Sequence, residues 1–145
     1  MAKFKFKFDS IIRVKEILQK RIQEEIASID KEINNLRHQL SVVNEERKKN
    51  LHSMLARPLK AAEFQSAKVY DSILEKQIIA IQKKIDLCIV KRNEKNLELV
   101  EKKKEQKVFE TLKENKQAEY DIDERRMELK EINEIGIRKY SGNQN

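Results

Sequence analysis

The sequence predicts an all-α protein, an antiparallel two-helix coiled-coil hairpin with a longer second helix, and three observations carry this prediction. Turn formers are scarce, with two Gly and one Pro in 145 residues, whereas a many-stranded sheet needs them at every turn. Charged residues make up 39% of the chain, which leaves too little apolar material for a thick globular core. Apolar residues also recur at an average period of 3.5 in two separate stretches, which is the spacing of coiled-coil seams.

The first helix is predicted over residues 9 to about 56. Asp9 directly precedes the helical pattern, and its short acidic side chain suits a helix start. The pattern falters at Arg47 and Asn50 and resumes loosely at Leu51, Met54 and Leu55. Its regular part has steps of four and three through Ile22, Ile26, Ile29, Ile33, Leu36, Leu40 and Val43.

A chain reversal is predicted at Pro58, because its ring biases the preceding residue away from helical geometry. We expect a turn at about residues 57–66, with Ser66 capping a second helix that runs over about 67–139. Gly136 is expected to mark the end of this helix, and the tail after Lys139 is expected to be frayed.

The second helix carries a matching ladder through Leu74, Ile78, Ile81, Ile85 and Cys88. The ladder then meets Arg92 and Lys95. Beyond this point the apolar positions drift to Ile89, Leu97, Val100, Val108 and Leu112. This drift predicts that the strict heptad is abandoned in the middle of the second helix.

Two seams that mirror each other across Pro58 favour a hairpin, in one domain over residues 1–145, over a dimer of straight helices. In such a hairpin, residues whose numbers sum to about 120 face each other. Residues 112–135 of the longer second helix are then left without a partner from the first helix.

The formal net charge of +7 suggests an acidic partner, but much of the excess lies in the Lys-Phe start and around the turn. Acidic residues interleave with the lysines of the second helix, and no aromatic lies among them to stack a base, so no nucleic-acid partner is expected. The start itself, with Phe4, Phe6 and Phe8 on one face, has two readings: a weak membrane-surface or partner-docking strand, or a short extension packed on the hairpin base.

The sequence predicts no catalytic, cofactor or metal site, and hence no enzyme. The two glycines lie at the C-terminal end, so no glycine-rich phosphate loop precedes a lysine. Cys88, His38 and His52 lack the spacing of a zinc site. One cysteine fits a reducing cytoplasm, and no apolar run approaches the roughly 18 residues of a membrane span.

Some apolar residues are not explained by the seam. Ile79, Val90 and Leu97 fall on the side of the second helix opposite the ladder. Together with Tyr70 and Ile73 near the turn, they indicate either a surface for another protein's helix or a drifting seam that buries Leu97.

Both ends of the chain resemble one known family. The opening Lys-Phe-Lys-Phe-Lys-Phe-Asp-Ser-Ile-Ile-Arg-Val-Lys-Glu (residues 3–16) and the closing Arg-Arg-Met-Glu-Leu-Lys-Glu-Ile-Asn-Glu-Ile (residues 125–135) resemble the flagellar export protein FliJ. Asn133 departs from the acid expected before Glu134.

The resemblance implies a cytoplasmic, non-catalytic stalk component of flagellar type III export, peripherally associated with the inner membrane at the flagellar base. It implies three partners, namely a hexameric export ATPase, the cytoplasmic part of the export gate and substrate chaperones, with a monomeric chain and no cofactor. The gate-contact residues that it implies are Tyr70, Leu74, Gln77 and Ile81. The alternatives are a homodimeric coiled-coil scaffold and, behind it, a basic nucleic-acid-binding arm.

Overall fold

The computed structural model describes residues 3–143, with the side chains of residues 3–142, and confirms the all-α helical hairpin. Two helices, α1 (Asp9–Ala56) and α2 (Ala61–Asn143), make up the fold, and no strand occurs within residues 3–143. The chain forms two compact units. One is Lys20–Val100, and the other joins the residues up to Gln19 to those from Glu101 onward. The single-domain organisation stays a prediction.

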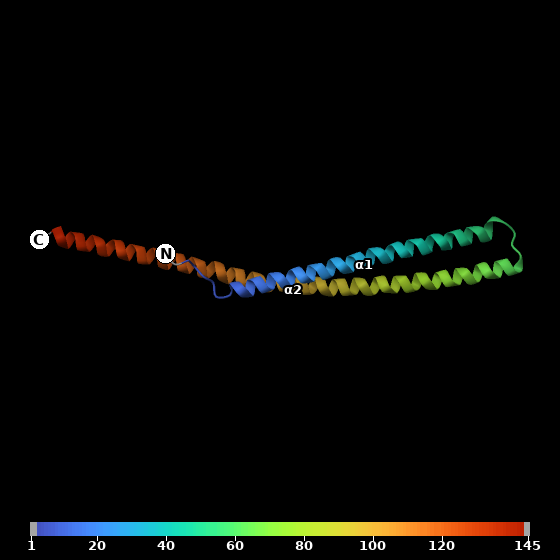
Figure 1. The fold of residues 1–145 in the computed structure, drawn as a ribbon, viewed down its shortest axis with the longest axis horizontal. Coiled ribbons are helices and arrows are strands. Elements are labelled where there is room, and N and C mark those ends of the chain that lie inside the picture. Colours follow the sequence, from blue (N-terminus) through green and yellow to red (C-terminus); the bar gives the residue numbers. More distant parts are fainter. Residues whose placement is uncertain (1–2, 144–145) are drawn as a thin grey trace. The chain divides into compact units, whose positions relative to one another are not determined.

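In the unit Lys20–Val100, α1 and α2 lie side by side and are joined by the turn (Figure 1). Ile33 and Leu74 are each 1% exposed, and Ile85 is 3% exposed. Burial of such side chains stabilises the pair by about 1.5–3 kcal/mol each. The central cluster is formed by Ile33, Leu36 and Ile85 and is flanked by Ile29, Leu40, Ile81, Cys88 and Ile89.

The seam of α1 does not falter at Arg47 and Asn50. Both side chains lie half-buried against α2. The Arg47 guanidinium donates to Asp71 Oδ1 at 2.8 Å, and Asn50 Nδ2 donates to the Ala67 carbonyl at 3.0 Å. The seam is expected to resume at Leu51, Met54 and Leu55. Only Met54 of these three is half-buried, since Leu51 and Leu55 are exposed.

The seam of α2 likewise continues through its basic residues. Arg92 pairs with Asp30 at 3.2 Å, and Lys95 pairs with Glu25 at 2.9 Å. The predicted drift is wrong for Leu97, Val100 and Val108, which are 72%, 49% and 66% exposed. The strict heptad steps persist in this unit because acidic residues of α1 form ion pairs with the basic residues at seam positions of α2. Leu99, at the next heptad step after Lys95, is half-buried.

The turn is shorter than predicted, since only residues 57–60 separate the two helices. α2 begins at Ala61 instead of about residue 67, and Phe64 N–H donates to the Lys60 carbonyl at 3.0 Å. Ala61, Ala62 and Glu63 are strong helix formers, and the acid in the first turn suits the positive end of the helix dipole. Ser66 therefore lies inside α2 and is not its cap.

In the second unit, α1 begins at Asp9, as predicted. The Asp9 carboxylate forms an ion pair with Lys113, in which Asp9 Oδ1 lies 2.8 Å from Lys113 Nζ. Further along the pair, Lys15 contacts Glu105 and Gln19 Nε2 donates to Gln106 Oε1. The residue numbers of these cross-helix pairs sum to about 120, so the predicted register is confirmed within each unit.

The residues before α1 pack on α2, so the packing reading of the Lys-Phe start is confirmed. The Phe4 and Tyr120 ring centroids are 5.4 Å apart, and those of Phe8 and Phe109 are 5.7 Å apart. Phe6 is 8% exposed, whereas the alternate lysines of this segment face solvent. The alternation turns three aromatic rings inward and three ammonium groups outward.

The C-terminal end of α2 also differs from its prediction. The helix continues through Gly136 to Asn143, so Gly136 does not end it. No glycine among the described residues has a positive φ, so the backbone there has ordinary helical geometry. The expected fraying of the tail is not observed up to residue 143, and its last two residues lie outside the described part.

Candidate partner-binding surfaces

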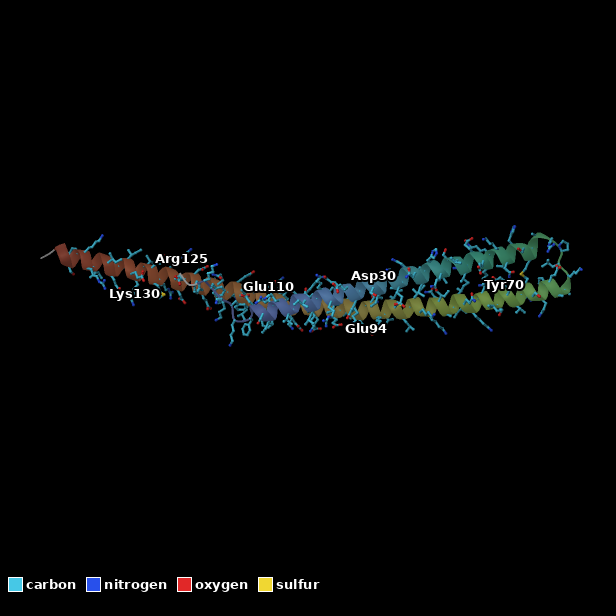
Figure 2. All side chains as sticks on the ribbon, viewed as in Figure 1. Asp30, Tyr70, Glu94, Glu110, Arg125 and Lys130 are labelled. Atoms are coloured by element: carbon cyan, nitrogen blue, oxygen red, sulfur yellow. The ribbon has the colours of Figure 1, made fainter. Side chains whose placement is uncertain are left out.

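The first candidate surface, here called the turn-proximal face, consists of Tyr70, Ile73 and Gln77 on α2. Tyr70 is 42% exposed, Ile73 is 48% exposed, and Gln77 is also exposed. The three side chains lie on successive turns of one helix side because their spacings are three and four residues. Figure 2 labels Tyr70 on α2 near the turn. They present an aromatic ring, an aliphatic group and an amide to a partner.

Contacts with α1 fix the position of Tyr70. Its hydroxyl donates to Glu46 Oε2 at 3.1 Å, and this hydrogen bond to a carboxylate raises the Tyr70 pKa. Next to it, Asp71 accepts from Arg47, whose guanidinium also lies 3.8 Å from Glu75. The hydrogen bond to Asp71 raises the pKa of Arg47. Polar contacts with α1 thus hold the Tyr70 ring in place, and its exposed part remains accessible to a partner.

Two of the four gate-contact residues that the family resemblance implies belong to the packing between α1 and α2. Leu74 is 1% exposed and lies inside the helix pair. Ile81 is half-buried and packs against the central cluster. A partner reaches Leu74 only if the helices separate, so Tyr70 and Gln77 are the accessible members of the set.

The second candidate surface, here called the outer face, consists of Ile79, Val90 and Leu97. They are 49%, 54% and 72% exposed, so the alternative in which the seam buries Leu97 is wrong. Their spacings of eleven and seven residues keep them on one side of an α-helix, which has about 3.6 residues per turn. A shallow hollow beside Val90 is lined by Lys83, Asp86 and Leu87.

The two faces do not form one site. Ile79 follows Tyr70 by nine residues, which is about two and a half turns, so the two side chains point to opposite sides of α2. Tyr70 with Gln77, and Ile79 with Val90, are therefore two separate surfaces of the unit Lys20–Val100.

Sequence reasoning missed apolar residues that surround the turn. Leu55 is 86% exposed, Phe64 is 43% exposed, and Leu51 is 42% exposed. A strict heptad predicts that Leu51 and Leu55 are exposed. Arg47, Asn50 and Met54 occupy the seam, and each leucine therefore lies one position away from it.

Within residues 3–143, no group of three or more His, Cys, Asp or Glu side chains is arranged to hold a metal ion. Cys88 is half-buried and packs against the central cluster, which is the environment of a small apolar residue.

Neither helix, over the residues described, contains a stretch that is long and apolar enough to cross a membrane.

These features define a class of protein, an antiparallel helical hairpin that offers exposed apolar and aromatic side chains on α2. The family model described as "Flagellar FliJ protein" matches residues 4–145. The chain belongs to this family, a non-enzymatic component of flagellar export, and membership supports an export-related role. No curated protein and no solved structure matches the chain.

Proposed function

We propose that this chain is a non-catalytic coupling component of the flagellar type III export apparatus. One copy binds the hexameric export ATPase, the cytoplasmic part of the export gate and substrate chaperones, at the cytoplasmic side of the inner membrane. The observation that carries the proposal is the turn-proximal face, because Tyr70, Ile73 and Gln77 are exposed directly beside the side of α2 that is tightly packed against α1.

The gate is assigned to the turn-proximal face. Tyrosine suits a protein interface because its rigid ring offers a large contact area and its hydroxyl offers a hydrogen bond. Tyr70 and Gln77 are in place before binding, since α2 is anchored on α1 through Asp71 and Leu74. A surface that is already ordered loses less entropy on association than a flexible one.

By analogy with the central stalk of rotary ATPases, the ATPase ring binds the unit that joins the residues up to Gln19 to those from Glu101 onward. A single asymmetric helix pair cannot make the same contacts with every subunit of a ring. Differential contacts are the physical requirement for coupling the states of two sites. The chain thus links the gate and the ring through unequal contacts and needs no chemistry of its own.

The experiment is a binding titration of the full chain with the cognate gate domain and, separately, with the cognate ATPase. Tyr70→Ala with Gln77→Ala removes the ring and the amide from the turn-proximal face. We expect at least tenfold weaker binding to the gate domain, since truncation of an aromatic interface residue commonly costs about 1.4 kcal/mol or more.

Two matched controls accompany the double variant. Ile79→Ala with Val90→Ala alters the outer face and is expected to leave gate binding within about threefold of the wild type. Tyr70→Phe removes only the hydroxyl that contacts Glu46. Unchanged binding of Tyr70→Ala with Gln77→Ala to both partners would remove the turn-proximal face from the proposal.

A further inference from the structure

The turn of the hairpin carries the whole excess of positive charge in the unit Lys20–Val100. Residues 48–68, here called the tip, include five Lys or Arg residues and one acidic residue, Glu63. The rest of the unit holds eleven Lys or Arg residues and eleven Asp or Glu residues, so its formal charge is zero. Figure 1 shows the turn at one end of the paired helices of this unit. The basic residues of the tip are Lys48, Lys49, Arg57, Lys60 and Lys68.

Most cations of the tip lack the acidic partners that other cations of the unit have. Arg92 and Lys95 each pair with an acid on the opposite helix. By contrast, Lys49, Arg57 and Lys60 are exposed, and none of the three forms an ion pair with a described residue. Their charges therefore remain available to an anionic partner.

The tip also exposes apolar side chains close to the ends of both helices. Leu55 is 86% exposed and precedes the last residue of α1, and Phe64 is 43% exposed and lies three residues after the start of α2. At a rise of about 1.5 Å per residue, both lie within about 5 Å of the helix ends along the axis. Side chains lean toward the N-terminus of their helix, which for α2 is the tip. Lys68 accordingly places its Nζ 5.7 Å from the centroid of the Phe64 ring.

The two apolar side chains point in different directions. Phe64 precedes Asp71 by one heptad, and Asp71 pairs with Arg47, so Phe64 lies on the side of α2 that faces α1. It is exposed there because α1 ends at the same level. Leu55 follows the half-buried seam residue Met54 and points away from the seam. A single partner helix would cover only one of the two side chains, whereas a fluid surface around the end of the hairpin reaches both.

We propose that the tip binds an anionic phospholipid bilayer. Leu55 and Phe64 enter the boundary between headgroups and acyl chains, which interfacial segments penetrate by roughly 5–10 Å. Lys49, Arg57 and Lys60 lie at the level of the lipid phosphates, where each cation strengthens binding about fivefold. The charges select an anionic surface, and the apolar side chains select a bilayer over a soluble polyanion such as a nucleic acid.

This inference goes beyond the proposed function, in which protein partners alone hold the chain at the inner membrane. Contact of the tip with lipid orients the unit Lys20–Val100 and holds the turn-proximal face close to the bilayer. The cytoplasmic part of a membrane-embedded gate lies in the same region.

Vesicle flotation of the full chain tests the proposal. The probes are vesicles of pure phosphatidylcholine and vesicles in which one lipid in three is phosphatidylglycerol. At about 0.1 M salt, we expect binding to the anionic vesicles to be at least tenfold stronger than binding to the neutral ones. Binding should weaken at about 1 M salt, because salt screens the charges. Equal binding to both kinds of vesicle, or no binding to either, would overturn the proposal.

Charge substitutions show whether the tip is the lipid contact. Arg57→Gln with Lys60→Gln removes two cations and should weaken binding to anionic vesicles at least tenfold. Lys83→Gln with Lys84→Gln is the matched control, because these exposed lysines carry the same charge and lie about 30 Å along α2 from its start. The control variant should bind within about threefold of the wild type. Equal losses in the two variants would refute the tip as the contact.

Apolar substitutions separate a bilayer from a soluble polyanion. Leu55→Gln should weaken binding to anionic vesicles several-fold, whereas Leu87→Gln, at a leucine that is 70% exposed and outside the tip, should not. Duplex DNA is the comparison ligand. If Arg57→Gln with Lys60→Gln weakens DNA binding while Leu55→Gln leaves vesicle binding unchanged, the tip is a general polyanion site and the bilayer proposal fails.

A fluorescent label reports insertion directly. In a Cys88→Ser background, Leu55→Cys and, in a separate chain, Leu87→Cys each carry a polarity-sensitive dye. Anionic vesicles should shift the emission of the dye to shorter wavelength in the Leu55→Cys chain and leave it unchanged in the Leu87→Cys chain. No shift in the first chain, or the same shift in both, would contradict insertion of the tip. These assays contain no protein partner, so lipid binding and the proposed function can fail separately.

Discussion

Polar residues on the seam are the least expected feature at the scale of single side chains. Arg47, Arg92 and Lys95 interrupt the apolar ladders, yet each occupies a seam position and pairs with an acid on the other helix. Such pairs are partly solvated and contribute little to stability individually. They do specify which residues face each other, because a shifted register would leave these charges against apolar side chains.

Substitutions in the core and on the surface should have very different costs. Ile33→Ala removes a side chain that is 1% exposed and is expected to lower the free energy of unfolding by about 2–5 kcal/mol. Leu97→Ala removes one that is 72% exposed and is expected to change it by less than about 0.5 kcal/mol. Urea denaturation followed by circular dichroism measures both, and a large cost for Leu97→Ala would mean that the seam does drift.

Stability should depend on pH through the seam carboxylates. Lys95 lowers the pKa of Glu25, and Lys15 lowers that of Glu105, from an ordinary value of 4.5. Because the folded-state pKa lies below the unfolded one, the stabilisation is present above about pH 4.5 and is lost as the pH falls through the folded-state pKa. The raised pKa of Lys95 has the opposite sign, so its contribution is lost only as the pH rises past about 10.5.

Glu25→Gln with Glu105→Gln tests this assignment. The double variant should be less stable than the wild type at pH 7. The difference should shrink on acidification to pH 3.5, which lies below the ordinary carboxyl pKa of 4.5, because the unfolded wild-type chain then binds protons that the folded chain binds less readily. Urea denaturation at both pH values measures the difference. A constant difference would show that these two carboxylates do not carry the acid sensitivity assigned to them.

At the scale of elements, the hairpin and its register were predictable, and the element ends were not. Asp9 and the two ladders predicted α1 and the facing of the helices, because a period of 3.5 admits one buried side. The predicted turn is too long, because Ser66 suits a cap but Ala61, Ala62 and Glu63 already favour helix before it. The prediction that Gly136 marks the helix end, which rests on the frequency of glycine after helices, is wrong because α2 continues to Asn143.

The candidate surfaces were partly predictable for the same reason. Ile79, Val90 and Leu97 could be assigned to the outer face from helical periodicity alone, and all three are exposed. That Leu74 belongs to the core also followed from the ladder. The hydrogen bond from Tyr70 to Glu46 could not be foreseen, because it depends on rotamers across the two helices.

The segment before α1 acts as an aromatic clasp on α2 in its own unit. Phe6→Ala removes a side chain that is 8% exposed and is expected to weaken this packing. Hydrogen exchange of amides in residues 101–120 should then become several-fold faster. Lys5→Ala, on the solvent side of the same segment, should leave it unchanged, and equal effects of the two substitutions would contradict the clasp.

For the whole molecule, charge and exposed apolar area together favour protein partners. Much of the net charge of +7 lies in the Lys-Phe start and around the turn, whereas elsewhere acids and bases interleave and several pair across the helices in the described part of the chain. Membership of the FliJ family supports a role related to flagellar export. The turn-proximal face is the surface on which this account depends.

Export in the cell tests that dependence most directly. In a strain that lacks its own copy of the chain, secretion of flagellar substrates into the medium is measured after complementation with the wild type, with Tyr70→Ala plus Gln77→Ala, and with Ile79→Ala plus Val90→Ala. All three chains should be equally abundant, since these side chains lie outside the core. The account predicts secretion at least several-fold lower for the first double variant and near wild type for the second, whereas full secretion with the first would contradict it.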